Sequence, residues 1–169
     1  AEQLICKSIQ RTRQNLTFAF QGGEPTLAGL AFYERAVELV KKLNSNRCHI
    51  SYALQTNGLL IDERWCRFLA ENRFLVGVSL DGTKALHDAN RVDAQGKGTF
   101  QRVMKALALL KKYQVDTNLL TVLTSNHCRY YQQISSFYER QGFAYQQFIP
   151  CLDPLDEERG GHPWSITPG

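Results

Sequence analysis

Hydrophobic positions recur along this chain with two alternating spacings, one typical of amphipathic helices and one typical of buried strands. Apolar residues three and four positions apart predict helices at residues 2–14, 30–43, 62–72, 99–112 and 128–141, with Asp62 and Thr99 as N-caps. Short apolar runs closed by turn residues predict strands at 16–20, 49–54, 74–80, 118–123 and 143–149. We expect residues 83–98 to form a polar loop and the residues after Pro150 an irregular tail.

The alternation of helix and strand predicts the fold class. Continuous apolar strands separated by amphipathic helices indicate an α/β fold with a parallel sheet. Right-handed crossovers then give either a doubly wound sheet or a segment of a barrel. The chain starts with a helix rather than a strand, which suggests a βα series whose first strand is missing.

Composition narrows the class of protein. The chain has 169 residues, 43% hydrophobic and 21% charged, which is ordinary globular usage and excludes a disordered chain. The net charge is only +4 and the basic residues are scattered, so a nucleic-acid surface is not indicated. No apolar run approaches the ~20 residues of a membrane helix, and the N-terminus has no apolar signal core.

The five cysteines are far apart in the sequence. They are Cys6, Cys48, Cys66, Cys128 and Cys151. An odd number at wide spacing argues against a disulfide scaffold and favours a reduced, cytoplasmic compartment. It also argues against a local zinc or iron–sulfur motif, which needs closely spaced thiolates. We therefore expect no metal ligands in this chain.

Candidate chemistry lies at the predicted strand ends, where ligands gather in parallel α/β folds. Four strand ends carry polar signatures: Gln21-Gly22-Gly23-Glu24-Pro25, Gln55-Thr56-Asn57-Gly58, Ser79-Leu80-Asp81-Gly82 and Pro150-Cys151-Leu152-Asp153. Any one of them alone reads as an ordinary turn. Together, and with Arg91 in the following loop, they favour a ligand with both charge signs. Glu24 could accept from an ammonium group, and Ser79 and Arg91 could donate to a carboxylate.

Two further features have weaker readings. Lys97 lies in Gly96-Lys97-Gly98-Thr99, and a glycine-rich helix start can hold phosphate. The full P-loop spacing is absent, because Arg91 stands where a glycine is required. His87, next to Asp88, is more simply a loop histidine with local hydrogen bonds.

In this order, the strand-end signatures resemble the radical S-adenosylmethionine enzymes, and among them the anaerobic sulfatase-maturating enzymes. The match covers about residues 16–155 and includes the GGEP motif and the stretch from His87 to Phe100. The resemblance implies a site for S-adenosylmethionine formed by Gln21, Gly22, Gly23, Glu24, Ser79, Arg91 and Leu152. Leu152 would contact the adenine side, and Gly22, Gly23 and Glu24 would line the methionine end. No catalytic residue is identified.

The resemblance also implies a fold and an activity. The fold would be a partial (β/α)6 TIM-like barrel, with residues 1–155 supplying strands two to six and residues 156–169 an irregular tail toward an absent C-terminal domain. The CxxxCxxC triplet that binds a 4Fe–4S cluster is not in this chain, so the chain alone would be an inactive fragment. In the parent enzyme, reductive cleavage of S-adenosylmethionine would give a 5′-deoxyadenosyl radical. That radical would take a Cβ hydrogen from a Cys or Ser of an unfolded sulfatase peptide, and oxidation would give formylglycine. Flavodoxin or ferredoxin would donate electrons in the cytoplasm, with no membrane or nucleic-acid partner.

Three alternatives remain open from the residues. One is another radical peptide maturase that forms crosslinks. The second is a phosphate-binding barrel enzyme of unrelated chemistry, with Gly96-Lys97-Gly98 as its site. The third is a folded scaffold without activity. These residues do not distinguish Cys-type from Ser-type specificity, and they do not identify the target peptide.

The spacing of the cysteines predicts that this chain by itself does not hold a 4Fe–4S cluster. After anaerobic reconstitution with iron and sulfide, the visible spectrum should show no stable charge-transfer absorbance. A stoichiometric cluster that resists chelators would contradict this prediction and would mean that distant cysteines assemble a site.

Overall fold

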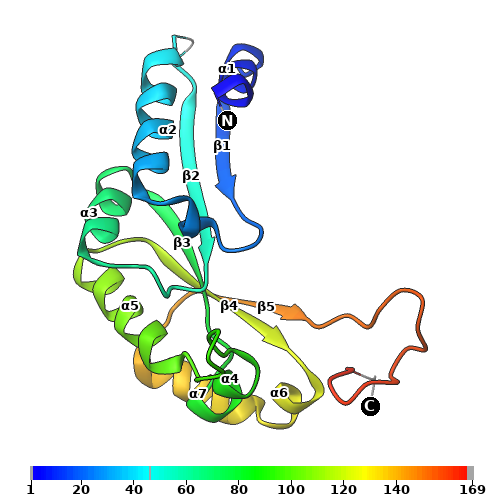
Figure 1. Ribbon diagram of the computed structural model, residues 1–169. Helices are drawn as coiled ribbons and strands as arrows, with labels where there is room; N and C mark the ends of the chain where they lie inside the picture. The colour runs from blue at the N-terminus through cyan, green and yellow to red at the C-terminus, as the bar shows by residue number, and fades with distance from the viewer. Residues whose placement is uncertain (1, 46, 167–169) are drawn as a thin grey trace. The chain divides into compact units, whose positions relative to one another are not determined.

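The computed structural model describes residues 2–45 and 47–166 (Figure 1). The last three residues of the expected tail, 167–169, lie outside this range. Five strands form one sheet in the order β1-β2-β3-β4-β5, in which β1 pairs with β2, and β4 with β5, in parallel. Spatial order therefore equals chain order, as in a β/α barrel, whereas a doubly wound sheet reverses direction part-way. The expected class, a partial TIM-like α/β barrel with parallel strands, is confirmed. The strands are β1 (Asn15–Phe20), β2 (His49–Thr56), β3 (Phe74–Ser79), β4 (Thr117–Leu123) and β5 (Gln146–Pro150).

One helix precedes the first strand, and the other helices lie between successive strands along the chain. The helices are α1 (Glu2–Arg11), α2 (Leu30–Leu43), α3 (Glu63–Glu71), α4 (Lys84–Asn90), α5 (Phe100–Lys112), α6 (Ser125–Arg129) and α7 (Tyr131–Gln141), with a 3₁₀ turn η1 (Pro25–Ala28). No helix in the described ranges has the length and apolarity needed to cross a membrane. The chain forms two compact units: residues 1–77 with 106–117, called the first unit, and residues 78–105 with 118–169, called the second unit.

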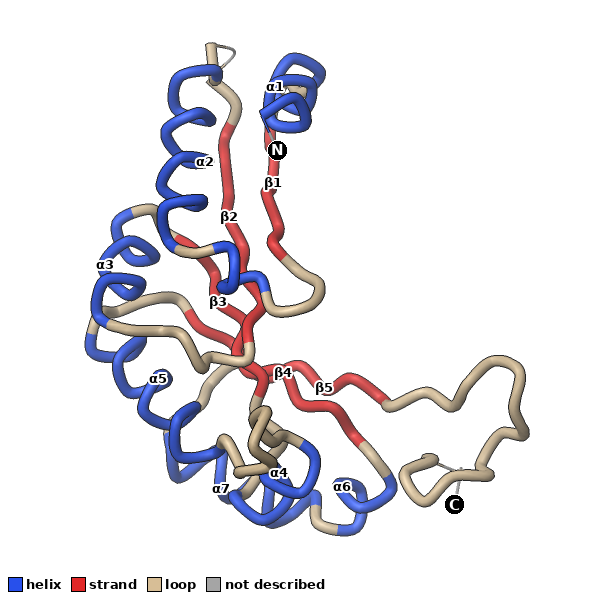
Figure 2. Tube along the Cα trace, in the orientation of Figure 1, coloured by secondary structure: helices blue, strands red, loops and turns tan. Residues whose placement is uncertain are grey.

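The core of the first unit is aromatic. Figure 2 shows α2 and α3 on the same side of the strands β1 to β3. Tyr33 of α2 packs edge-on against Trp65 of α3, with ring centroids 5.1 Å apart, and against Phe20 at the end of β1. Asp62 begins α3 as predicted, because its carboxylate accepts from the Trp65 N–H at 2.9 Å. Burial of these rings fixes how the two helices lie on the sheet.

Tyr138 of α7 organises the core of the second unit. Its buried hydroxyl donates to the Leu80 carbonyl at 2.6 Å and accepts from the Gly82 N–H at 2.9 Å. A Cβ at Gly82 would lie 2.8 Å from Cγ1 of Ile134, so only glycine lets α7 approach this closely. Tyr138 therefore holds the chain in a defined path where it leaves β3.

Two predictions about helices were wrong. Residues 84–90 form α4 rather than a loop. One of its two buried positions is His87, a polar residue that interrupts the apolar pattern. The helix predicted at 128–141 is two helices, α6 and α7. Thr124 and His127 form a capping box that begins α6 earlier, and a break at Tyr130 separates α6 from α7 and leaves Tyr131 exposed. The ends of the other elements differ from the predictions by up to three residues.

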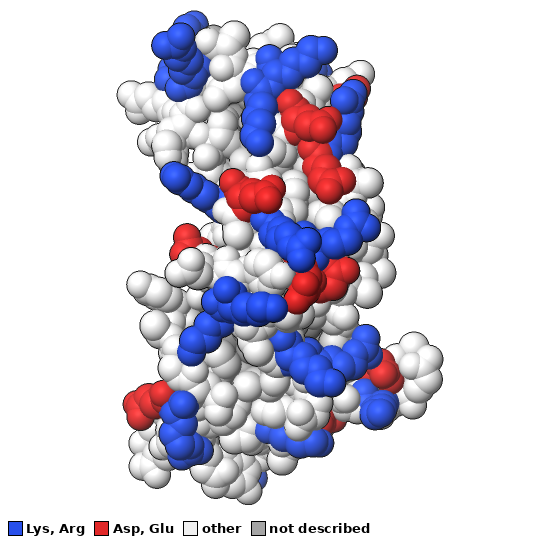
Figure 3. All heavy atoms as spheres, turned by 90° about the vertical axis from the view of Figure 1, so that its left-hand side faces the viewer, with Lys and Arg blue, Asp and Glu red and all other residues white. Residues whose placement is uncertain are grey.

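The outer surface carries both charge signs. Figure 3, which views the left-hand side of Figure 1, shows acidic and basic side chains interspersed across this face. Several form exposed ion pairs, such as Lys112 with Glu63 at 3.1 Å and Arg67 with Glu63 at 3.3 Å. Exposed pairs of this kind contribute little to stability, typically less than about 1 kcal/mol each.

β1 lies at one end of the strand order and pairs only with β2 within the described part of the sheet. Helix α1 packs against α2 and lies beyond the beginning of β1 in Figure 1. Unpaired N–H and C=O groups on such an edge template association between chains. We expect this chain to self-associate as its concentration rises, as measured by analytical ultracentrifugation.

A lysine on the edge should reduce this association. Ala19 is an exposed alanine on β1, and Ala31 is an exposed alanine on α2. Ala19→Lys should shift the chain toward monomer, whereas Ala31→Lys, with the same change in charge, should not. A wild-type chain that stays monomeric at high concentration would contradict the prediction.

Candidate functional site

The carboxylate of Glu24 joins the end of β1 to the end of β2 in the first unit. Its Oε1 accepts from the Thr26 and Thr56 hydroxyls, at 2.6 and 2.7 Å, and from the Thr26 N–H at 3.1 Å. Its Oε2 accepts from the Asn57 N–H at 2.7 Å. A carboxylate oxygen can take more than one donor, so Oε2 retains capacity for a further one. Glu24 is thus chiefly a structural tie, with one oxygen able to meet a ligand ammonium.

Tyr33 anchors the loop that contains Glu24 and Pro25, and its hydroxyl stays protonated. The Tyr33 hydroxyl donates to the Pro25 carbonyl at 2.8 Å. Burial and, secondarily, the Glu24 charge raise the pKa of Tyr33 to about 12. The hydroxyl therefore keeps its proton at any physiological pH and continues to anchor the loop.

The Gly22-Gly23 backbone is open. Gly22 has φ +105° and Gly23 φ +55°, and a Cβ on either would meet nothing within 4 Å. Backbone conformation, rather than crowding within the chain, therefore explains glycine at position 22. Gln21 is exposed beside them. A ligand can reach these peptide groups directly.

In the second unit, the structure pairs Arg91 with Asp81. Arg91 Nε donates to Asp81 Oδ2 at 2.5 Å, and Nη2 donates to Oδ1 at 3.3 Å. Asp81 is buried, whereas the Arg91 side chain is 26% exposed. Ser79 is half-buried, and its hydroxyl has no hydrogen-bond partner in the described residues. Ser79 and the outer donors of Arg91 can therefore donate to a ligand carboxylate.

His87 is part of this arrangement rather than a solvated loop residue. Its Nδ1 accepts from the Asp81 N–H at 3.2 Å, so Nε2 carries the hydrogen and donates to the Thr99 hydroxyl at 3.0 Å. Thr99 in turn donates to the Arg91 carbonyl at 2.9 Å. Burial lowers the pKa of His87 below its ordinary 6.5, and Arg91 also lowers it, whereas Asp81 and Asp88 oppose the shift. His87 is thus a neutral, fully bonded imidazole.

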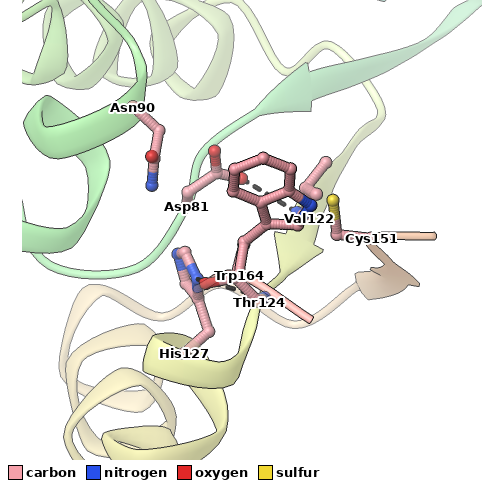
Figure 4. Close-up of a pocket in the computed structure, with 7 residues that line it drawn as sticks. All are labelled: Asp81, Asn90, Val122, Thr124, His127, Cys151 and Trp164. Atoms are coloured by element: carbon pink, nitrogen blue, oxygen red, sulfur yellow. Dashed lines mark hydrogen bonds between the residues drawn. The ribbon is translucent and has the colours of Figure 1, made fainter. Parts of the chain in front are cut away.

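A cavity of about 360 Å³ lies in the second unit, at the carboxyl ends of β3, β4 and β5 (Figure 4). The seven lining residues are Asp81, Asn90, Val122, Thr124, His127, Cys151 and Trp164. His127 is 1% exposed, and its Nδ1 faces both the hydroxyl and the N–H of Thr124, at 2.8 and 3.3 Å. Two donors at Nδ1 place the ring hydrogen on Nε2, which has no partner in the described residues. His127 therefore lines the cavity and keeps one buried N–H donor without a partner in the described residues.

The tail places Trp164 at this cavity. The Ser125 N–H and hydroxyl donate to the Trp164 and Pro163 carbonyls, at 3.0 and 2.6 Å. The Asp153 carboxylate holds the tail in a loop by accepting from the Ser165 hydroxyl and the Gly160 N–H. Leu152, a predicted site residue, is 82% exposed and does not line the cavity.

The glycine-rich segment at Lys97 has a structural explanation. Gly96 occupies a turn with φ +75°, and a Cβ on Gly98 would lie 2.2 Å from Cγ of Asp88. Asp88 Oδ1 accepts from the Phe100 N–H at 2.8 Å. Asp88 therefore takes the capping role predicted for Thr99, whose hydroxyl is bonded elsewhere. A carboxylate already occupies the helix start where a phosphate would bind.

The predicted site residues fall in two groups. Gln21 to Glu24 belong to the first unit, and Ser79, Arg91 and Leu152 to the second. All five cysteines are free, and no group of three potential metal ligands occurs within the described residues. Sequence reasoning missed Asp81 as the partner of Arg91 and His127 as a cavity residue. The usable signals were an acid directly after a buried strand and a histidine three residues after a threonine N-cap.

Comparison with known proteins supplies the family. Residues 5–128 match the radical SAM superfamily, so this chain belongs to that superfamily. It is 46% identical over 99% of its length to a cysteine-type anaerobic sulfatase-maturating enzyme of Clostridium novyi, covering 45% of that protein. It is 38% identical over 88% of its length to a serine-type anaerobic sulfatase-maturating enzyme of Klebsiella aerogenes, covering 37% of that protein.

A solved structure agrees with these relatives. The structure described as native anSMEcpe with bound AdoMet and Kp18Cys peptide matches with a TM-score of 0.95 and 47% identity. The match covers 98% of this chain and 46% of that one. The chain thus spans about half the length of the curated relatives it matches.

The buried neutral state of His87 predicts a pH dependence of stability. In the unfolded chain His87 takes up a proton below about pH 6.5, whereas the folded chain resists that proton. The unfolded state then binds more protons, so stability is lost as pH falls below 6.5. Titration of this one group changes the free energy of unfolding by at most about 1.4 kcal/mol per pH unit.

Urea unfolding measured between pH 7 and 5 tests this prediction. His87→Gln should flatten the pH dependence, whereas His49→Gln, at an exposed histidine, should retain it. Equal slopes for the two variants would show that His87 is not the group responsible.

Proposed function

We propose that this chain is the S-adenosylmethionine-binding barrel segment of an anaerobic sulfatase-maturating enzyme, which oxidises a Cys or Ser of a sulfatase to formylglycine. The observation that carries this proposal is the match to the structure described with AdoMet and a Cys-containing peptide, at 47% identity over nearly the whole chain. Relatives of both the cysteine and the serine type are similar to this chain. The proposal therefore leaves the choice between the two target residues open.

Each unit, taken by itself, carries groups whose chemistry suits one end group of the methionine moiety of the cofactor. The outer donors of Arg91 and the free Ser79 hydroxyl would bind its carboxylate. Glu24 Oε2 and the open Gly22-Gly23 backbone would meet its ammonium group, with Gln21 beside them. This assignment uses the groups that have spare bonding capacity.

The cavity suits the adenosyl end. Trp164 offers an aromatic face and Val122 an apolar wall, and the His127 side chain completes the lining. Leu152 is exposed next to Cys151, which lines the cavity, so its side chain is free to cover an adenine from outside.

The iron–sulfur cluster does not fit this chain. The cysteines are free and ungrouped, and the described residues hold no candidate metal site. We therefore propose that the ligands of a 4Fe–4S cluster come from outside residues 1–169. Such a cluster would supply the electron for cleavage of the cofactor, and this chain would bind and orient the cofactor. An unfolded sulfatase peptide as substrate, flavodoxin or ferredoxin as electron donor, and a cytoplasmic location complete the proposal.

Two substitutions separate cofactor binding from phosphate binding. In the full-length enzyme that we propose contains this chain, Arg91→Ala should remove a charge-assisted hydrogen bond of roughly 1.5–3 kcal/mol. It should therefore weaken S-adenosylmethionine binding about 10- to 100-fold. Lys97→Ala is the matched control, because Lys97 is exposed and its ammonium group forms no ion pair in the described structure.

Calorimetric titration of both variants with S-adenosylmethionine and with a phosphate ester measures these effects. The result expected is a loss of S-adenosylmethionine affinity in Arg91→Ala alone. If Arg91→Ala bound normally while Lys97→Ala lost a phosphate site, the proposed function would be abandoned for a phosphate-binding barrel.

A further inference from the structure

The Asp81 carboxylate receives three hydrogen bonds, and two of them come from one arginine. Arg91 donates through Nε and Nη2, and the Val122 N–H of β4 donates to Oδ1 at 2.9 Å. A guanidinium has five N–H donors in a planar fork. Two of those of Arg91 are used here, so three point elsewhere. Both the position and the plane of the guanidinium are fixed by Asp81 from one side.

The backbone of Arg91 is fixed as well. Its carbonyl accepts from the Thr99 N–H at 3.1 Å and from the Thr99 hydroxyl at 2.9 Å. His87 connects that hydroxyl to the Asp81 N–H. Asp81 therefore holds Arg91 at two levels, directly through its carboxylate and indirectly through His87 and Thr99.

Such a restraint matters because an arginine side chain is long and mobile. Ordering a free arginine on a ligand costs the rotamer entropy of its long side chain. An arginine already held by a buried carboxylate meets this cost on folding rather than on binding. The pair also has no net charge, so its attraction for an anion comes from oriented donors rather than from an unbalanced positive charge.

We propose that Asp81 is a positioning residue that orients the free donors of Arg91 toward a ligand carboxylate, that of S-adenosylmethionine. This inference rests on the function proposed above. It predicts an effect of Asp81→Asn on ligand affinity that is opposite to the effect expected from the change in charge alone. Asp81→Asn removes a negative charge next to Arg91, which by Coulomb attraction alone would tighten binding of an anion. Loss of orientation weakens it instead.

A double-mutant cycle in the proposed full-length enzyme tests the inference. The affinity for S-adenosylmethionine is measured by calorimetry for the wild type, Asp81→Asn, Arg91→Ala and the double variant. We expect Asp81→Asn to weaken binding about 5- to 30-fold, a loss of about 1–2 kcal/mol. In the Arg91→Ala background the same change should alter affinity less than about twofold.

Asp88→Asn is the matched control. Asp88 is an acid of the same unit that pairs with Lys84 and caps α5 without contacting Arg91. The substitution should lower the unfolding temperature but leave the affinity for S-adenosylmethionine within about twofold. If Asp81→Asn does not fold, Asp81→Glu replaces it in the cycle, since it keeps the charge and displaces the carboxylate.

The outcomes separate the inference from the function on which it rests. If Asp81→Asn tightens binding, or weakens it equally with and without Arg91, Asp81 does not act through Arg91 and the inference is overturned. If Arg91→Ala leaves binding unchanged, the carboxylate site itself is wrong. If Asp81→Asn lowers the affinity for S-adenosylmethionine only when Arg91 is present, the result supports both the inference about Asp81 and the proposed function.

Discussion

The buried carboxylate of Asp81 is the interaction on which the second unit of this protein depends. It joins the end of β3 to the loop at Arg91 and to β4, three segments separated by 10 to 41 positions in the chain. A buried carboxylate without partners is very costly, so the surrounding donors must hold their places. Tyr138 fixes the path of the chain on either side by bonding to Leu80 and Gly82. The geometry of Arg91 follows from these restraints.

The first unit uses the same device at its own strand ends. Glu24 collects four donors from two loops, including the Thr56 hydroxyl and the Asn57 N–H at the end of β2. In both units a carboxylate directly after or near a strand end replaces water at backbone groups that the sheet no longer pairs. Both carboxylates leave neighbouring groups open: the Gly22-Gly23 backbone in one case, and the outer donors of Arg91 in the other.

Because different groups hold the chain and meet the ligand, the same strand ends can serve both structure and ligand binding. Glu24 and Asp81 accept hydrogen bonds from the chain itself. Arg91, Ser79 and the Gly22-Gly23 backbone keep groups that are free to meet a ligand. Asp88 shows the same principle where it excludes a ligand, because it caps α5 and fills the position that a phosphate would need. A glycine-rich helix start is therefore an anion site only when no side chain of the protein has already taken it.

The sequence by itself determined the alternation of helices and strands, the Asp62 cap, the α/β class and the segments that carry the candidate site, because these depend on local periodicity and turn chemistry. It did not determine α4, whose inward residue is His87, nor the break between α6 and α7 at Tyr130. Only tertiary structure decided that Asp81 meets Arg91, that His87 is bonded on both nitrogens, and that His127 lines a cavity while its buried Nε2 has no partner in the described residues. The reason is physical: a polar residue in a loop has the same local pattern whether it faces water or a buried partner, and its partner is chosen by packing between segments distant in the chain.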